Sequence, residues 1–211
     1  MAVASVVIFD LDGTLVDSVG DLASAGNVAR AAVGLARLGE ADIARFVGDG
    51  VDRLIERLVP EAVKRIAAKQ AFERHYDVHC CDRTRPYPGV PELLDRLAAV
   101  GWTLAVATNK PLAFTRRILA AAGIAARFAE VRGGDGPRKP DPGQLSDILR
   151  VTGGIAARSW MVGDHHTDVR AGHAAGCRVL FCTWGLGHRD GLVADAEAAT
   201  PAQVAELLGA P

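Results

Sequence analysis

The stretch Asp10-Leu11-Asp12-Gly13-Thr14 decides the fold, because it follows the apolar run Val3 to Phe9 at the point where a strand must end. Side chains alternate across a strand, but the chain coils as it leaves a sheet, so Asp10 and Asp12 can both point into one pocket. Gly13 relaxes the turn that follows. Two carboxylates placed in this way favour phosphoryl transfer, in which one attacks phosphorus and the other exchanges protons. Taken alone, the pair also fits a helix cap or a calcium loop.

Three further segments place polar groups at the ends of expected strands. The apolar run Trp102 to Ala107 leads into Thr108-Asn109-Lys110, whose hydroxyl and amide groups can donate to a phosphate oxygen. Lys139 follows a glycine-rich turn, and the apolar residues 160–162 lead into Gly163-Asp164-His165-His166-Thr167-Asp168. Complementary groups at several strand ends indicate a single site.

In order and spacing, these groups resemble motifs I to IV of the haloacid dehalogenase superfamily, from Val6 to about Gly187. Four stretches resemble the phosphoglycolate phosphatases of that superfamily in particular: Phe46 to Val51, Pro86 to Val90, Thr108 to Pro111 and Gly133 to Asp135. The resemblance implies a Rossmann-like parallel sheet with an inserted helical cap. It also implies hydrolysis of 2-phosphoglycolate to glycolate and phosphate through an aspartyl phosphate.

The pattern along the chain predicts an α/β fold in three segments. From Pro86 onward apolar strands alternate with helical stretches, which is typical of a parallel sheet covered by helices. Residues 16–85 contain only helical patterns and are expected to form a cap domain inserted between core segments 1–15 and 86–211. The two linkers must lie close together and form a hinge, about which the cap can close over the strand ends.

Charge in the expected pocket predicts a metal ion. Asp10, Asp12 and Asp164 bring up to three negative charges, and each like pair at ~4 Å costs about 4 kcal/mol at an effective dielectric of ~20. A phosphate ester therefore needs one divalent cation and one lysine beside it. Ligands that are all oxygen favour Mg²⁺. The resemblance assigns these ligands as the Asp10 carboxylate, the Asp12 backbone carbonyl and the Asp164 carboxylate.

The remaining core residues receive roles that lean on the resemblance. Lys139 is expected to neutralise the nucleophile and the phosphoryl oxygens, and Thr108 to donate to the transferring group. Asp168 lies one helical turn after Asp164 and can hold Lys139 or a metal-bound water. Gly13 and Asn109 are expected to contact the substrate. The alternative for Lys139 is a lysine in a solvated loop. The alternatives for Thr108 and Asp168 are a cap of the strand end and a surface acid, respectively.

Asp12 and the residues after Asp164 distinguish this chain from its superfamily. Dehalogenases of the superfamily lack a second acid at the Asp12 position, and transport ATPases carry threonine there. Asp12 can protonate an ester oxygen and then activate water, which favours hydrolysis of phosphate monoesters. Where the family usually has serine or threonine after the motif IV aspartate, this chain has His165 and His166. These histidines either alter the surroundings of the metal or are simply exposed.

Substrate choice is expected to lie in the cap. Gly48, Asp49 and Gly50 can turn backbone amides toward an anion, and Arg53, one turn beyond, can meet a carboxylate such as that of phosphoglycolate. The alternative is an ordinary turn with Arg53 in solvent.

The amino-acid composition narrows the kinds of molecule that this protein is expected to bind. The 211 residues carry 24 Lys and Arg against 25 Asp and Glu with no basic stripe, which argues against nucleic acid. No stretch approaches the ~18 apolar residues of a membrane span, so a cytoplasmic protein is expected. We expect it to act on a small phosphate ester and to be a monomer or a homodimer. The alternatives are a sugar-phosphate phosphatase, a phosphotransferase like β-phosphoglucomutase, and a metabolite-binding protein without catalysis.

Overall fold

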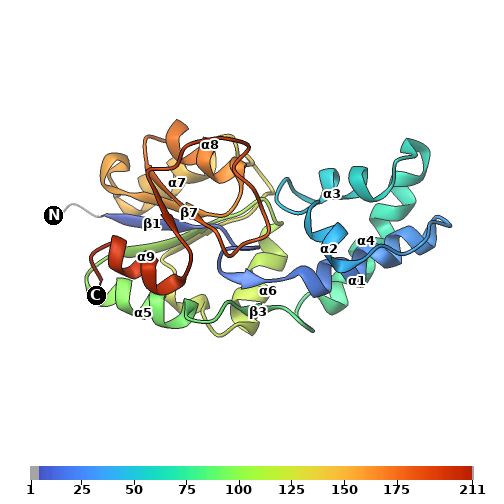
Figure 1. Cartoon of the computed structure of the whole chain (residues 1–211), viewed down its shortest axis with the longest axis horizontal. Helices are drawn as coiled ribbons and strands as arrows, with labels where there is room; N and C mark the ends of the chain where they lie inside the picture. The colour runs from blue at the N-terminus through green and yellow to red at the C-terminus, as the bar shows by residue number, and fades with distance from the viewer. Residues whose placement is uncertain (1–4, 211) are drawn as a thin grey trace.

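The computed structural model describes residues 5–210 and divides into a sheet-containing core and a helical cap (Figure 1). Val3, which the sequence places in the first strand, lies outside the described residues, as do the other residues of 1–4 and Pro211. Within the described part, no helix combines the length and apolar character needed to cross a bilayer.

The core is built on a six-stranded parallel sheet in the order β5-β4-β1-β6-β7-β8. Its central strands are apolar and buried, as expected for strands covered on both faces. The strands are β1 (Val6–Phe9), β4 (Thr103–Ala107), β5 (Glu130–Arg132), β6 (Trp160–Gly163), β7 (Arg178–Cys182) and β8 (Ala196–Ala198).

Helices cover both faces of this sheet because successive strand side chains point to opposite sides. On one face, Val7 and Phe9 pack in a cluster with residues of α5 (Val90–Ala99), α6 (Leu112–Ala121) and α9 (Pro201–Leu207). On the other face, Val6 and Ile8 pack with α7 (Gly143–Thr152) and α8 (His166–Ala174). Short 3-10 turns at Ala125–Arg127 and Ala156–Arg158 lead into β5 and β6. The fold class predicted from the sequence is confirmed.

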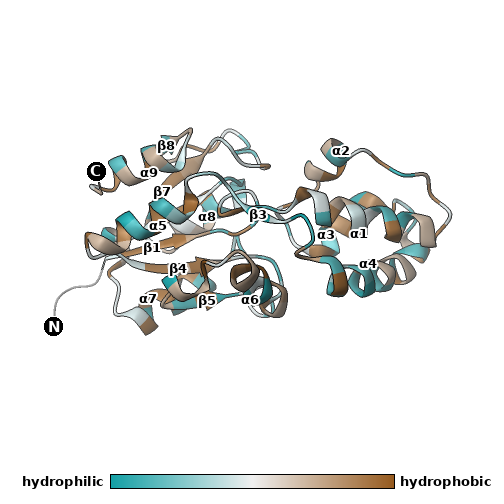
Figure 2. Ribbon diagram, turned by 90° about the horizontal axis from the view of Figure 1, so that it is seen from below, coloured by the Kyte–Doolittle hydropathy of each residue, from teal (hydrophilic) through white to brown (hydrophobic). Residues whose placement is uncertain are grey.

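The cap is a helical unit with its own apolar cluster, which includes Leu22, Ile43, Leu58 and Phe72. It lies to one side of the core, beyond the carboxyl ends of the central strands (Figure 2). Its elements are α1 (Val19–Ala32), α2 (Glu40–Ala44), α3 (Val51–Leu58), a 3-10 turn (Ala62–Lys64) and α4 (Arg65–His79).

Two short antiparallel strands join the cap to the core. β2 (Val16–Asp17) pairs with β3 (Arg85–Pro86), so the chain enters and leaves the cap at one place. This arrangement is the paired linker that the sequence indicates, and the division into domains at residues 15/16 and 85/86 stays a prediction. The pairing gives the cap a two-stranded connection about which it can turn.

Candidate active site

The candidate site lies at the carboxyl ends of three neighbouring strands. Asp10 follows β1, Thr108 follows β4 and Asp164 follows β6, and β1 is hydrogen-bonded to both β4 and β6. Lys139 reaches the same edge from the loop after β5. Parallel strands place their carboxyl ends together, which is why residues far apart in the sequence meet here.

Lys139 connects the nucleophile candidate to a second acid. Its Nζ donates to Asp10 Oδ1 at 2.7 Å, to Asp168 Oδ1 at 2.7 Å and to the Ala107 carbonyl at 2.6 Å. The side chain is buried, which by itself lowers the pKa of an ammonium group. The two carboxylates outweigh this and hold the pKa of Lys139 above its ordinary value. Lys139 is therefore a fixed positive charge between Asp10 and Asp168.

Asp164 is held by the opposite wall of the site. Its Oδ1 accepts from Thr14 Oγ1 at 2.9 Å, and its Oδ2 accepts from the backbone N–H groups of Leu186 and Gly187 at 2.8 and 2.9 Å. A Cβ at Gly13 would lie 2.2 Å from Asp164 Oδ2, so only glycine lets this carboxylate approach the motif I turn.

Burial destabilises the ionised forms of two of these carboxylates. Desolvation raises the pKa of Asp10 to about 6, although Lys139 opposes the change. Desolvation, with the charges of Asp10 and Asp168, raises the pKa of Asp164 to about 7. An added cation between these carboxylates would favour their ionised forms.

The acidic cluster can hold a metal ion. One carboxylate oxygen from each of Asp10, Asp164 and Asp168 lies within 4.8 Å of the others. Both oxygens of Asp168 already accept hydrogen bonds, from Lys139 and from the backbone N–H of His165. Asp168 therefore orients Lys139 and the start of α8. Asp164 also accepts hydrogen bonds on both oxygens, so hydrogen bonding does not separate these two acids as ligands.

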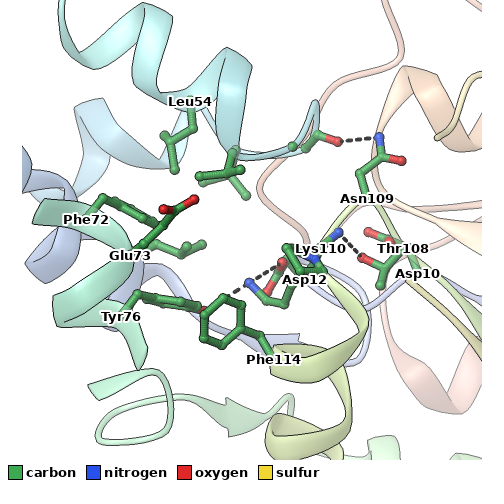
Figure 3. Close-up of a pocket in the computed structure, with 16 residues that line it drawn as sticks. Asp10, Asp12, Leu54, Phe72, Glu73, Tyr76, Thr108, Asn109, Lys110 and Phe114 are labelled. Atoms are coloured by element: carbon green, nitrogen blue, oxygen red, sulfur yellow. Dashed lines mark hydrogen bonds and ion pairs between the residues drawn. The ribbon is translucent and has the colours of Figure 1, made fainter. Parts of the chain in front are cut away.

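The second motif I acid faces the cap side of the same site (Figure 3). Asp12 Oδ2 lies 2.8 Å from Lys110 Nζ, and Asp12 Oδ1 accepts from Ser18 Oγ at 2.6 Å. Lys110 also donates to Tyr76 OH at 2.9 Å and lies over the Tyr76 ring. The sequence analysis gave Lys110 no role of its own, although it belongs to the stretch Thr108-Asn109-Lys110 that was singled out.

Thr108 and Asn109 use their polar groups differently. The Thr108 hydroxyl accepts from the Lys110 backbone N–H at 3.3 Å, which leaves the hydroxyl proton for another acceptor. Asn109 Nδ2 donates to the carbonyls of Gly48 and Lys139 at 3.1 and 2.9 Å. Asn109 thus links the cap loop to the Lys139 loop, whereas the sequence predicted that its amide would donate to the substrate.

A cavity of about 70 Å³ opens between these groups and the cap. The core supplies the polar end, and the cap supplies a largely apolar wall with Glu73 beside it (Figure 3). The lining residues include Asp10, Asp12, Thr108, Asn109, Lys110, Leu54, Phe72, Tyr76 and Phe114.

The cap loop reaches this cavity, but Arg53 does not. Gly48 and Gly50 line the cavity, whereas Asp49, also predicted to meet the substrate, is not among the lining residues and pairs with Arg57. Arg53 points away: its side chain is 66% exposed and pairs with Glu56 at 2.6 Å on the outside of α3. The structure therefore corrects the expectation that Arg53 faces the substrate, because one helical turn beyond Gly50 carries it to the solvent side.

The two motif IV histidines are not equivalent. His165 is buried, and burial together with neighbouring His166 lowers the pKa of His165 to about 4. It also caps α8, since its Nδ1 lies 3.4 Å from the Thr167 N–H and its own N–H donates to Asp168. The expectation of simply exposed histidines is wrong for His165, because the loop turns its ring under the cap.

Comparison with known protein families shows to which class of protein this chain belongs. The haloacid dehalogenase-like hydrolase family matches residues 7–182, which include Asp10, Asp12, Thr108, Lys139, Asp164 and Asp168. The chain belongs to this family of hydrolases, and the resemblance identified from the sequence is confirmed.

Individual relatives narrow the class further. A phosphoglycolate phosphatase of Mesorhizobium japonicum is 37% identical over 192 residues, which cover 87% of this chain and 85% of that protein. The crystal structure of a predicted phosphoglycolate phosphatase from Haemophilus somnus superposes with a TM-score of 0.89 at 32% identity and covers 97% of both chains. Protein tyrosine kinase A of Mycobacterium tuberculosis superposes with a TM-score of 0.86 at 29% identity and covers 99% of this chain and 100% of that one.

Proposed function

We propose that this hydrolase is a Mg²⁺-dependent phosphatase of small phosphate monoesters, with 2-phosphoglycolate as the leading substrate. The observation that carries the proposal is the position of Asp10: Lys139 fixes one of its oxygens at 2.7 Å, and the residue lines a cavity that also holds Asp12. A fixed carboxylate beside a second acid is the arrangement that covalent phosphoryl transfer requires.

The donors in the site fit Mg²⁺. They are oxygen atoms, which this ion prefers, and the raised pKa values of Asp10 and Asp164 indicate that a positive charge is needed between them. Asp10 and Asp164 would hold the ion with their carboxylates, and Asp12 with its backbone carbonyl. When bound, the ion would offset the charge of the carboxylates and of the phosphate.

The residues of this chain then divide the reaction into two steps. In the first, Asp10 attacks phosphorus, the bond between phosphorus and the ester oxygen breaks, and Asp12 gives its proton to that oxygen. In the second, the ionised Asp12 takes a proton from water, which attacks phosphorus and releases Asp10. Lys110, 2.8 Å from Asp12, would neutralise the carboxylate that forms between the two steps.

Three groups would position the transferring phosphoryl group. The Thr108 hydroxyl has a proton to donate at the polar end of the cavity, and Lys139 supplies positive charge beside Asp10. Gly13 keeps the motif I turn close to Asp164. The cap wall would exclude water from the nucleophile until the leaving group has departed.

Phosphoglycolate is supported by the phosphoglycolate phosphatases among the relatives. Because Arg53 lies outside, Lys110 is the lysine in the lining that could meet the glycolate carboxylate. A second candidate is a sugar phosphate, because Glu73 lies at the cavity and its carboxylate can accept from sugar hydroxyls.

The deciding experiment is a screen of phosphate monoesters ranked by kcat/KM, with and without Mg²⁺. The proposal expects metal-dependent phosphate release with phosphoglycolate at the head of the ranking. A sugar phosphate at the head would favour the second candidate, and isomerised sugar phosphate in excess of free phosphate would indicate a phosphotransferase. No metal-dependent release from any ester would leave a metabolite-binding protein.

A further inference from the structure

A second group of potential metal ligands lies where the cap loop meets the core. Asp49 comes from the cap, between α2 and α3, whereas His165 precedes α8 and His166 is the first residue of α8. One ligand atom from each of the three lies within 4.8 Å of the others. The group is separate from the carboxylate cluster of Asp10, Asp164 and Asp168.

The distances suit a shared ion better than direct contacts. His166 Nε2 lies 3.7 Å from Asp49 Oδ1 and 3.7 Å from Asp190 Oδ2, which is too far for a good hydrogen bond. Two ligands at ~2.0–2.1 Å from a tetrahedral ion are about 3.3 Å apart, so a small inward movement would bring these atoms to bonding positions. Asp190 approaches only His166 in this way and lies outside the group of three.

The side chains around this group are already oriented by other contacts. Asp49 Oδ2 is held by Arg57 at 2.5 Å, and His165 Nδ1 lies 3.0 Å from Thr167 Oγ1. Asp190 Oδ1 lies 2.7 Å from His188 Nδ1. Metal ligands commonly have such outer partners, which fix the direction of the remaining ligand atom.

The two ring nitrogens of His166 have different surroundings. Nε2 is the atom that lies near Asp49 and Asp190, whereas Nδ1 is buried and has no hydrogen-bond partner among residues 5–210. An ion at Nε2 would leave Nδ1 unpartnered, so the three clustered ligand atoms themselves indicate the site. The His166 ring also packs tilted against the His165 ring, with centroids 4.1 Å apart, so both rings face the same small space.

We propose that Asp49, His165 and His166 form a second cation site for a divalent transition metal ion of the zinc type. Two imidazoles and one carboxylate match the nitrogen and oxygen ligands that Zn²⁺ accepts, whereas Mg²⁺ prefers oxygen alone. The site therefore differs in ion preference from the carboxylate cluster next to it.

Occupancy of this site would couple to the position of the cap. Asp49 belongs to the cap loop and the histidines to the core, so one ion would tie the two parts together. Gly48 already packs against the His165 ring, since a Cβ there would lie 2.6 Å from His165 Cδ2. A bound ion would therefore hold the loop down and slow the opening that releases product.

The first test is direct metal binding with Mg²⁺ present in excess to occupy the carboxylate cluster. Dialysis against Zn²⁺ followed by elemental analysis should find one zinc per chain in the wild-type protein. His166→Ala and Asp49→Asn should each lose it. His173→Ala is the matched control, because His173 lies on the same α8 helix, pairs with Asp195 and should leave binding unchanged.

The second test reports on the ligands and on the loop. Cu²⁺ bound in place of Zn²⁺ should show nitrogen hyperfine coupling in its electron paramagnetic resonance spectrum, and His166→Ala should reduce the number of coupled nitrogens. Zn²⁺ should also slow hydrogen exchange at residues 47–50 in the wild-type protein and not in His166→Ala. Zinc retained in both variants, or a copper spectrum without nitrogen coupling, would overturn the proposal. Circular dichroism of each variant separates loss of the site from loss of the fold.

Discussion

At the scale of single residues, burial decides which charges the site tolerates. Asp10, Lys139 and Asp168 are all nearly removed from water, and the two anions share one ammonium group. One lysine faces two carboxylates, so these three side chains carry a net negative charge when both acids are ionised. That net charge, rather than any single contact, explains why the site should bind a cation.

The nucleophile gives the first prediction. Asp10→Asn should reduce kcat by at least about a thousandfold, because the neutral amide cannot attack phosphorus. The fold should remain intact, since Lys139 keeps its contacts with Asp168 and Ala107. Turnover of p-nitrophenyl phosphate measures the first effect and circular dichroism the second. Substantial residual turnover by a pure sample would reject Asp10 as the nucleophile.

The raised pKa values predict how the metal-free protein responds to pH. Asp10 and Asp164 lose protons near pH 6 and 7 in the folded state, against an ordinary value of 3.8. The folded state binds these protons more tightly, so stability should fall as pH rises from about 4 to about 7, by about 3 kcal/mol for Asp10 alone. Mg²⁺ should therefore raise Tm more at pH 8 than at pH 5.

A variant isolates this effect from other titrating groups. Asp164→Asn removes one of the two buried acids, so its stability relative to the wild-type protein should increase with pH across that window in EDTA. Urea denaturation at several pH values measures the difference. A difference that does not change between pH 4 and 8 would show that Asp164 titrates normally.

Lys110 gives a prediction about the second acid. Lys110→Met keeps most of the side-chain volume but leaves Asp12 without its cation, and breaking a buried pair costs about 3–5 kcal/mol. Tyr76→Phe removes only the hydroxyl at 2.9 Å and should cost about 1 kcal/mol. Urea denaturation of both variants measures the two losses in the free energy of unfolding, whose ratio is the prediction. Equal losses would mean that Lys110 serves mainly to satisfy Tyr76.

At the scale of elements, a single carboxylate fixes the cap to its hinge. Asp21 on α1 is buried and accepts from the backbone N–H groups of Arg83 and Thr84 and from the Thr84 hydroxyl. These contacts hold the returning strand β3 beside the start of the cap. The hinge therefore has a defined anchor as well as its two-stranded pairing.

Removal of that anchor should weaken the cap as a unit. Asp21→Ala leaves two buried N–H groups unpaired and should lower the free energy of unfolding by about 2–3 kcal/mol. Asp17→Ala in β2, whose carboxylate accepts one exposed hydrogen bond from Val19, is the control and should cost under about 1 kcal/mol. Hydrogen exchange should rise throughout α1 and α4 in Asp21→Ala alone. Similar exchange in both variants would deny Asp21 its anchoring role.

The elements also show what sequence patterns can and cannot reveal. The strands Thr103–Ala107 and Trp160–Gly163 lie where the apolar runs at 102–107 and 160–162 predict them, because each run ends at polar residues. The edge strand Ala196–Ala198 and the helix Pro201–Leu207 were not predicted. The strand is too short and polar to show alternation, and its pairing with β7 is set by the tertiary fold.

The candidate site likewise contains some contacts that the sequence predicts and others that it does not. Asp10, Asp164 and Lys139 could be predicted to meet because parallel strands share one edge. The contact of Lys110 with Asp12 and Tyr76 depends on how the cap is seated on the core, and no local pattern encodes that. The solvent position of Arg53 depends on the rotation of α3 about its axis, which a loop motif leaves undetermined.

At the scale of the whole molecule, activity depends on how closely the cap approaches the core. Gly48 is one point where the cap meets the core: its carbonyl accepts from Asn109 at 3.1 Å, and its backbone packs against the His165 ring. Its φ of +121° lies in a region that other residues rarely adopt. Both the backbone conformation and the lack of a side chain therefore let the loop close over the cavity.

Gly48→Ala should hold the cap away from the core. The new Cβ would lie 2.6 Å from His165 Cδ2, so the loop must lift, the Asn109 contact must break and water must reach Asp10. We expect kcat/KM to fall by roughly tenfold or more, since small displacements of positioning groups have large kinetic effects.

Gly34→Ala is the matched control, because Gly34 also has a positive φ, of +76°, but has nothing within 4 Å of an added Cβ. Both variants should lose about 1 kcal/mol of stability from backbone strain, and only Gly48→Ala should lose activity and gain hydrogen exchange at residues 47–50. Equal kinetic losses in the two variants would show that backbone strain, and not the seating of the cap, accounts for the effect.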